Sequence, residues 1–458
     1  MESNPPLRAT FAAVGDASET YALDEVVYRS KSGGLLEVRH DVEALRAARA
    51  PAEWRALLDS RTSRSPFPYA SGVWSKRELV QPHLDDADIV SLHEGNGHLF
   101  DASKLGSSFG LPRLFVKQCG TSHTGSFKDL GMTVLVSTVR AMRRKGAPIR
   151  AIACASTGDT SAALAAFGAA AGIAVVVLLP RGKITTAQLV QPIAIGALVA
   201  ALETDFDGCM KAVQALTKDP TIYLANSMNS LRVEGQKTLA IEIAQDFGWD
   251  VPEWVVVPGG NLGNVSAIAK GFLEMQELGL ITKLPRIACC QAERANPLFR
   301  AFTRAMADGG RPVALADFEP ISAQSTLASA IQIGDPVSLP KALVALERLH
   351  GVVEQATEEE LANAAAKADR TGLFTCPHTA VALACANKLR QAGTLREEDR
   401  VVVVSTAHGL KFTEFKQRYH EATLDFPSPL ANEPVSLPGD PTLAVEALHR
   451  ALDARSAF

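Results

Sequence analysis

Short apolar runs alternate with longer Ala-rich stretches through most of this chain, and this alternation restricts the fold more than any other feature. The runs are β-branched and continuously apolar, which is typical of strands buried on both faces of a sheet. Parallel strands need a crossover between them, usually a helix, so the pattern predicts an α/β fold with mostly parallel sheets. The predicted strands are Leu114–Lys117, Ala151–Cys154, Val175–Leu179, Leu198–Leu202, Ile222–Leu224, Trp254–Val257, Ile287–Gln291 and Val401–Ser405. The predicted helices are Asp129–Lys145, Ser161–Ala171, Glu234–Phe247, Val265–Leu278, Glu358–Arg370 and Thr379–Gln391.

The two ends of the chain depart from this pattern. Residues 1–90 carry Pro, Ser and Trp between weakly patterned segments, and we interpret them as an arm packed on the main body. Residues 421–458 hold a Pro-rich stretch and then a short helix, for which Asp440 is the expected N-cap and Pro441 the first turn. In the body of the chain, Thr357 and Glu360 have the spacing of a capping box, which predicts a helix start.

The composition is that of an ordinary globular protein, with 458 residues of which 47% are hydrophobic and 21% charged. A net charge of −4 offers no basic surface for nucleic acid or an anionic membrane. We find no apolar run near the roughly 20 residues of a membrane span, and no targeting signal in residues 1–20. Seven cysteines without a CxxC pair suit buried, reduced thiols in the cytoplasm. A plastid protein whose transit peptide had been removed would look the same.

The heptad His123–Asp129 is the strongest indication of chemistry. It places Lys128 where a loop containing Gly and Ser meets a predicted helix, shortly after a predicted strand. A lysine shielded from water has a lowered pKa, and its neutral amine can attack a carbonyl group to form a Schiff base. The neighbouring Phe127 favours such shielding. A solvated surface lysine is the other interpretation, and the heptad alone does not decide between the two.

A second indication is the glycine-rich segment Gly259–Asn264, which follows a predicted strand and opens a predicted helix. Backbone N–H groups at a helix start are suited to binding a phosphate. The segment lacks the third glycine of the dinucleotide fingerprint and the GK[ST] of a P-loop, and a tight turn without a ligand is the alternative. A phosphate loop combined with a carbonyl-binding Lys128 makes pyridoxal phosphate the candidate cofactor.

Three further segments follow predicted strands, where ligands bind in open α/β sheets. Ser156–Thr160 fits either a cradle for a substrate carboxylate or a helix cap formed by Thr157 or Asp159. Asn226–Arg232 offers donors for a second anion, or is a helix-entry loop with a surface arginine. Thr406 could donate a hydrogen bond to a pyridine nitrogen. The sequence contains no HExxH, no Cys/His cluster with metal spacing and no GxSxG, so we expect no metal.

Taken in order, these segments make the chain resemble the threonine synthases, and most closely the plant-type branch of that family. The resemblance extends from about Tyr21 to His420, which is nearly the whole chain, and it is far more specific than any single motif. It is carried by Tyr28–Leu35, Lys117–Asp129, Ala155–Ser161, Pro258–Asn264, Ala330–Pro336 and Ser405–Lys411.

The resemblance implies the fold type II architecture of pyridoxal phosphate enzymes, in which a large and a smaller open α/β domain hold the cofactor between them. It implies a large cofactor-binding domain formed by residues 91–128 and 226–420, and a smaller substrate domain formed by residues 129–225. The arm, residues 1–90, and the C-terminal extension, residues 421–458, lie outside these two domains.

The resemblance also implies an activity. The reaction converts O-phospho-L-homoserine and water into L-threonine and phosphate, the last step of threonine biosynthesis, with Lys128 as Schiff base and as acid and base. The implied cofactor contacts are Phe127, Lys128, Asp159, Gly259, Gly260, Asn261, Leu262, Gly263, Asn264 and Thr406. The implied substrate contacts are Ser156, Thr157, Thr160, Asn226, Ser227 and Arg232. The resemblance places Asp159 beside the cofactor's phenolic oxygen, where many relatives of this fold carry Asn and the plant-type branch carries Asp.

Two other functions fit parts of the pattern. A dehydratase of serine or threonine with the same fold needs only one anion site, whereas a phosphorylated substrate needs a second, which Arg232 could supply. A catalytically silent metabolite-binding protein is the third hypothesis. The resemblance further implies a homodimer, and S-adenosylmethionine as an effector bound by the arm.

Overall fold

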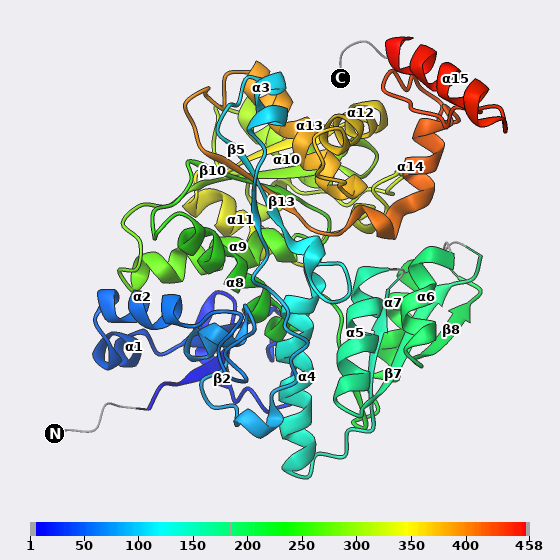
Figure 1. Cartoon of the computed structure of the whole chain (residues 1–458). Helices are drawn as coiled ribbons and strands as arrows, with labels where there is room; N and C mark the ends of the chain where they lie inside the picture. The colour runs from blue at the N-terminus through cyan, green and yellow to red at the C-terminus, as the bar shows by residue number, and fades with distance from the viewer. Residues whose placement is uncertain (1–5, 157, 183–185, 205, 455–458) are drawn as a thin grey trace.

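The computed structural model describes residues 6–156, 158–182, 186–204 and 206–454. In these residues the alternation of strands and helices produces two mostly parallel sheets, and a further small sheet lies in the arm. The helix α4 (Lys128–Arg144) stands near the middle of the molecule in Figure 1. The four-stranded sheet and its helices lie to its right, and the six-stranded sheet occupies the upper part of the view.

The six-stranded sheet has the strand order β12-β11-β10-β13-β5-β4. Neighbouring strands run parallel except for β4, which pairs antiparallel with β5. Every residue of β10 and β13 is buried, which explains why these strands appear in the sequence as continuous apolar runs. The strands are β4 (Leu99–Asp101), β5 (Leu114–Gln118), β10 (Trp254–Pro258), β11 (Arg286–Ala292), β12 (Val352–Ala356) and β13 (Val401–Ser405).

The four-stranded sheet has the strand order β8-β7-β6-β9, and all of its pairs are parallel. Its central strand β6 is buried along its whole length. The carboxyl ends of β6 and β9 lead into two of the segments predicted to bind ligands. The strands are β6 (Ala151–Ala155), β7 (Ala174–Pro180), β8 (Leu198–Leu202) and β9 (Ile222–Leu224).

The arm forms a three-stranded antiparallel sheet that the sequence analysis did not predict. Its order is β2-β1-β3, with β1 (Ala9–Ala13), β2 (Asp16–Tyr21) and β3 (Leu36–His40). The strands are short and contain few β-branched residues, so their local signal is weak. Burial of Phe11 and Val38, which belong to the main hydrophobic cluster, stabilises the sheet through tertiary packing instead.

Helices connect successive strands and cover both large sheets, as expected for this class. The α-helices are α1 (Val42–Ala48), α2 (Pro51–Ser60), α3 (Ser103–Phe109), α4, α5 (Asp159–Ala170), α6 (Thr186–Ala194), α7 (Phe206–Leu216), α8 (Ser230–Asp246), α9 (Gly263–Glu277), α10 (Pro297–Ala307), α11 (Leu339–Arg348), α12 (Glu358–Asp369), α13 (Pro377–Gln391), α14 (Thr413–His420) and α15 (Pro441–Ala454). The 3-10 helices are η1 (Trp74–Leu79), η2 (Asp86–Asp88), η3 (Cys119–Thr121), η4 (Glu293–Ala295), η5 (Leu315–Asp317), η6 (Ser329–Ile331) and η7 (Gly409–Phe412).

All eight predicted strands and all six predicted body helices are confirmed, and their boundaries differ by a few residues. The largest shift is at α8, which begins at Ser230 and not at Glu234, because the side chain of Asn229 caps it by accepting from the N–H of Leu231 at 3.1 Å. The predicted cap of the last helix is confirmed: Asp440 accepts from the N–H groups of Thr442 and Leu443 at 3.0 Å.

The sequence analysis missed β4 and β12 and several helices, among them α10 and α11. The short strands β4 and β12 are only partly buried, so they lack the continuous apolar run that marked the others. The first turns of α10 and α11 each contain a proline, Pro297 and Pro340, which is a helix-start signal that the analysis did not use.

All seven cysteines are buried, as predicted. Among the described residues, no helix combines the length and the apolar character needed to cross a membrane. The domain boundaries at residues 128, 225 and 420 stay a prediction.

The capping box of α12 is a local interaction whose loss should be measurable. Glu360 N–H donates to Thr357 Oγ1 at 3.1 Å, and Thr357 N–H donates to Glu360 Oε2 at 2.8 Å. We expect Thr357→Ala to lower the free energy of unfolding by about 1 kcal/mol, because the first turn of the helix loses its acceptor. Urea unfolding followed by circular dichroism measures this change. Thr357→Ser keeps a hydroxyl and is the control; an equal loss in Thr357→Ser would contradict the capping explanation.

Candidate active site

Two helices that carry predicted site residues cross with almost no space between them. Gly131 of α4 lies against Arg232 of α8, since a Cβ on Gly131 would be 2.7 Å from the Arg232 carbonyl oxygen. A Cβ on Gly235 would collide with the carbonyl oxygen of Leu130. Only glycine fits at both positions, and the crossing therefore brings the first turn of α4, with Lys128, to the first turns of α8, with Arg232.

The loop before Lys128 is held by a buried carboxylate. Asp129 accepts hydrogen bonds from the Thr124 N–H at 2.8 Å, from Thr124 Oγ1 at 2.5 Å and from Ser122 Oγ at 2.8 Å. These bonds fold the segment back on the start of α4, where a carboxylate also interacts favourably with the helix dipole. Burial is the main influence on this group and raises the pKa of Asp129. Lys128 thus starts a helix whose preceding loop is held in place by hydrogen bonds to Asp129, a residue of the same helix.

The same loop pairs with the segment that follows β13. Phe127 N–H donates to the Thr406 carbonyl oxygen at 2.9 Å, and His408 N–H donates to the Gly125 carbonyl oxygen at 2.9 Å. Ser126 and Ala407 form an isolated antiparallel bridge between these two bonds. The structure therefore places Thr406 next to Lys128, although the two are far apart in the sequence.

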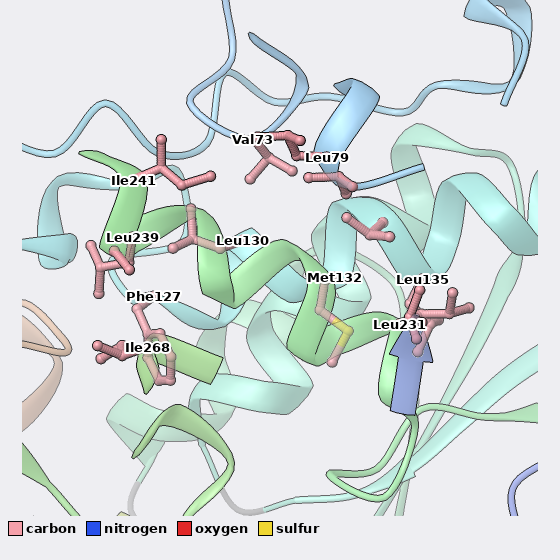
Figure 2. Packing of buried hydrophobic residues seen from close by; sticks show 14 of the residues in the cluster. Val73, Leu79, Phe127, Leu130, Met132, Leu135, Leu231, Leu239, Ile241 and Ile268 are labelled. Atoms are coloured by element: carbon pink, nitrogen blue, oxygen red, sulfur yellow. The ribbon is translucent and has the colours of Figure 1, made fainter. Parts of the chain in front are cut away.

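The amine of Lys128 lies in an environment that favours its neutral form. Burial is the largest cause, followed by the positive charge of Arg232, and together they lower the pKa of Lys128 to about 8, against the smaller opposing influences of Asp159 and Cys376. The amine lies 4.1 Å from the centroid of the Phe127 ring. Phe127 itself is buried in the hydrophobic cluster that contains Leu239 and Ile268 (Figure 2). Lys128 as a whole residue is nevertheless only partly buried.

The glycine-rich segment forms the turn between β10 and α9. Gly259 N–H donates to the Cys290 carbonyl oxygen at 2.7 Å, and Asn264 Nδ2 donates to the Pro258 carbonyl oxygen at 2.7 Å. A Cβ on Gly260 would lie 2.8 Å from the Cα of Ile331, so this position requires glycine. The turn ends at the first residues of a 15-residue helix, whose N–H groups have no partners within the helix.

Arg232 is buried beside the segments that follow β6 and β9. It is only 3% exposed, so the alternative of a surface arginine is wrong. Its guanidinium donates to the Ala225 carbonyl oxygen at 3.1 Å and to Thr160 Oγ1 at 3.3 Å. In the part of the chain that the structure describes, its Nε has no hydrogen-bond partner. Burial lowers the pKa of Arg232 to about 10, which still leaves it cationic at neutral pH.

The start of α5 differs from the predicted cap. Asp159 and Thr160 belong to the first turn of the helix, so Asp159 is not the N-cap; that position is held by Gly158. The Ser156 hydroxyl accepts from the N–H groups of Gly158 and Ser161, both at 3.3 Å, because it is the side chain that faces the turn. Thr157 lies outside the described residues.

The segment after β9 divides into two kinds of residue. The Asn226 amide pairs with the backbone of Ala155 through both of its ends, accepting from the N–H at 3.0 Å and donating to the carbonyl oxygen at 2.9 Å. In this structure Asn226 therefore ties the end of β6 to the end of β9. Ser227 is half-buried. The predicted contacts of Asn226 and Ser227 with a substrate phosphate stay predictions.

Cys376 is a neighbour of the site that the sequence analysis missed. It is the N-cap of α13, where Thr379 N–H donates to its sulfur at 3.4 Å, and its sulfur lies 3.9 Å from Thr406 Oγ1. Burial alone would raise the pKa of Cys376, but hydrogen bonds from His378 and Thr379 outweigh it and lower the pKa to about 7. The signal was present in the sequence, because a polar residue before Pro377 marks a helix start.

A second cluster of ionisable side chains lies under the arm. His40, Glu234 and Glu274 bring their ligand atoms within 4.8 Å of one another, as a metal site does. The ammonium group of Lys237 occupies this position, at 2.5 Å from Glu234 Oε2 and 2.6 Å from Glu274 Oε2. Lys237 thus balances the buried carboxylates, and the cluster joins the arm to α8 and α9.

Comparison with known proteins identifies the family. The family of pyridoxal-phosphate dependent enzymes matches residues 90–407, which include both large sheets, Lys128 and the glycine-rich turn. The chain belongs to this family.

Curated relatives narrow the assignment to the threonine synthases. Threonine synthase 2, chloroplastic, of Arabidopsis thaliana is 54% identical over 430 residues, which cover 93% of this chain and 81% of the relative. Threonine synthase of Methanocaldococcus jannaschii is 39% identical, covering 86% of this chain and 91% of the relative. The crystal structure of threonine synthase from Escherichia coli has the same fold, with a TM-score of 0.64 at 21% identity, covering 96% of this chain and 100% of that one. Within the family, the chain is therefore a member of the threonine synthases.

The residues at the site fit pyridoxal phosphate. An amine at Lys128 that loses its proton more readily than an ordinary lysine suits the aldehyde, and the N–H groups at the start of α9 suit the phosphate. Gly260 packs against Ile331 with no room for a side chain, so the turn presents backbone at this position. Thr406, whose carbonyl oxygen accepts from the N–H of Phe127, brings a hydroxyl-bearing residue to the loop of Lys128. The roles of the individual residues toward the cofactor stay predictions.

The lowered pKa of Lys128 predicts how cofactor capture depends on pH. Only the neutral amine reacts, so the rate at which cofactor-free protein binds pyridoxal phosphate should rise with pH and level off above about 8. An ordinary lysine would continue to rise toward about 10.4. We expect Arg232→Gln to move the inflection to higher pH, because it removes a neighbouring positive charge. Stopped-flow absorbance measures the pH dependence of cofactor binding in the parent and in Arg232→Gln, and Arg150→Gln, which changes an exposed arginine, is the control. An inflection near pH 10 in the parent would contradict a lowered pKa of Lys128.

Proposed function

We propose that this chain converts O-phospho-L-homoserine and water into L-threonine and phosphate, with Lys128 as the acid and base. The observation that carries the proposal is the buried guanidinium of Arg232. It is near enough to Lys128 to lower the pKa of that amine, and it is separate from the glycine-rich turn at α9. The site thus offers two anion-binding positions, one for the phosphate of the cofactor and one for the phosphate of the substrate.

When bound, pyridoxal phosphate supplies an aldehyde that condenses with amines and a ring that stabilises negative charge on the adjacent carbon. The protein's own groups account for the rest. Lys128, neutral above about pH 8, takes the proton from the substrate Cα. Gly259, Gly260, Asn261, Leu262, Gly263 and Asn264 bind the cofactor phosphate, and the Thr406 hydroxyl faces the ring nitrogen. A hydroxyl at that nitrogen does not force its protonation.

The substrate is held at two ends. Ser156 and Thr160, with Thr157, bind the substrate carboxylate at the start of α5, where helix N–H groups favour a negative charge. Arg232, supported by Asn226 and Ser227, binds the departing phosphate. Arg232 donates to Thr160 Oγ1 at 3.3 Å, so the carboxylate and phosphate positions are neighbours. A compact substrate with both groups fits this spacing, whereas serine or threonine would leave Arg232 without an anion.

Three finer proposals rest on family likeness. We propose that the chain forms a homodimer and that S-adenosylmethionine binds the arm as an effector. We propose that it acts in the cytoplasm, or in a plastid if a transit peptide has been removed; the relative from Arabidopsis thaliana is described as chloroplastic. Light scattering after size-exclusion chromatography tests the dimer. Isothermal titration calorimetry with S-adenosylmethionine tests the effector. A titration that shows no heat of binding would contradict the proposal that S-adenosylmethionine binds this chain.

The role of Lys128 has a direct test. The parent protein should absorb at the edge of the visible range, and borohydride should fix the cofactor on Lys128, as peptide mapping would reveal. We expect Lys128→Ala to lose the absorbance and to turn over phosphohomoserine about 10³-fold more slowly or worse, because it lacks both nucleophile and base. Phosphate release and threonine formation measure the rate. Lys388→Ala, a lysine of α13 outside the site, is the control; parent-like turnover by Lys128→Ala would refute the assignment.

The role of Arg232 separates the proposed substrate from its competitors. We expect Arg232→Gln to raise the Michaelis constant for phosphohomoserine, since a lost charge-assisted hydrogen bond costs about 1.5–3 kcal/mol, roughly ten- to a hundredfold. Binding of serine, which has no phosphate, should change much less. Rapid release of pyruvate or oxobutyrate by the parent, without turnover of phosphohomoserine, would favour a dehydratase instead.

A further inference from the structure

Lys411 is a charged residue at the site that does not belong to the predicted cofactor or substrate contacts. It lies in η7, three residues after the His408 N–H that pairs with the Gly125 carbonyl oxygen. Its side chain is only 13% exposed and passes directly over Gly125. Gly125 has a φ of +80°, which glycine adopts without strain, and a Cβ there would lie 3.1 Å from Lys411 Cδ. Glycine at this position therefore allows both the backbone turn and the close approach of the Lys411 side chain.

The ammonium group of Lys411 joins three separate segments. It donates hydrogen bonds to the Thr124 carbonyl oxygen at 2.8 Å and to Gln191 Oε1 of α6 at 2.6 Å, and it lies 3.3 Å from Asp159 Oδ1 of α5. Gln191 Nε2 also donates to the Thr124 carbonyl oxygen, at 3.2 Å. The loop of Lys128 and two helices of the four-stranded sheet are therefore linked through one side chain that follows β13 of the other sheet.

The charge of Lys411 is as important as its position. Asp159 is 7% exposed, and among the described residues its Oδ1 makes no hydrogen bond, so the ion pair with Lys411 is its principal compensation. An uncompensated buried carboxylate is costly. Asp159 is also near enough to Lys128 to influence that amine. A bare negative charge at this point would repel the phenolic oxygen of the cofactor, which the family resemblance places beside Asp159.

We propose that Lys411 is a positioning residue: its ammonium neutralises Asp159 beside the cofactor and fastens α5 and α6 to the loop of Lys128. This inference rests on the proposed function of the site. It explains how an aspartate can stand where many relatives of this fold carry asparagine, because the aspartate and Lys411 together present a neutral pair. Neutralising Asp159 and linking the helices to the loop are separate contributions of Lys411. The neutralisation of Asp159 is the contribution that sets the affinity for the cofactor.

A cycle of variants distinguishes the charge from the hydrogen bonds. The readout is the dissociation constant of pyridoxal phosphate, measured by absorbance titration of the cofactor-free full chain. Lys411→Gln keeps a donor for Thr124 but removes the charge, and Lys411→Met removes both. We expect each to weaken cofactor binding about ten- to a hundredfold, since Asp159 loses its cation. Lys388→Met, which alters an ion-paired lysine of α13 away from the site, is the matched control and should bind like the parent.

The decisive step adds Asp159→Asn to each variant. An asparagine needs no cation and can donate to the phenolic oxygen, so Asp159→Asn should restore most of the lost affinity in both double variants. Affinity that stays as low as in Lys411→Met would mean that Lys411 acts only through Thr124 and Gln191, which would overturn the proposal. Parent-like affinity in Lys411→Gln would overturn it as well. If Lys411→Met fails to fold, Lys411→Gln carries the test. Because cofactor affinity does not depend on the substrate, failure here is distinct from failure of the proposed reaction.

Discussion

The close crossing of α4 and α8 is the constraint on which the rest of the site depends. Gly131 and Gly235 leave no room for side chains, and each lies against backbone of the opposing helix. The two N-terminal ends are thereby held together, and each carries one of the cations at the site, Lys128 and Arg232. A larger residue at either glycine would separate the helices, and the guanidinium of Arg232 would then lower the pKa of Lys128 less.

Burying charged groups together is costly unless they are compensated, and the site compensates its two buried carboxylates in different ways. Arg232 favours the neutral form of Lys128, while Asp159 opposes it and is itself paired with Lys411. Asp129 holds the preceding loop through three hydrogen bonds from Ser122 and Thr124. The result is an amine with a pKa of about 8 near Arg232, whose Nε has no hydrogen-bond partner within the described ranges and is available to an anion.

Much of the fold could be predicted, because buried parallel strands leave continuous apolar runs and helix starts leave capping residues. The runs at Trp254 and Val401 gave strands whose residues are all buried, and Thr357 capped its helix as expected. The arm's sheet was missed because its short strands are stabilised by distant packing. Of the two alternative cap residues, Thr157 and Asp159, Asp159 is wrong, because the start of the helix depends on where the backbone turns, which residue types do not specify.

The sequence by itself determined the α/β class, the candidate lysine Lys128, the glycine-rich turn and the family. The first three can be recognised from the local spacing of residues, and the family from a resemblance that extends over most of the chain. Tertiary structure alone decided which charges meet. Lys411 reaches Asp159 across about half the chain, and Cys376 reaches Thr406 only because α13 begins beside the end of β13. Such pairings depend on where the ends of strands from two sheets come together, and no local pattern encodes that distance.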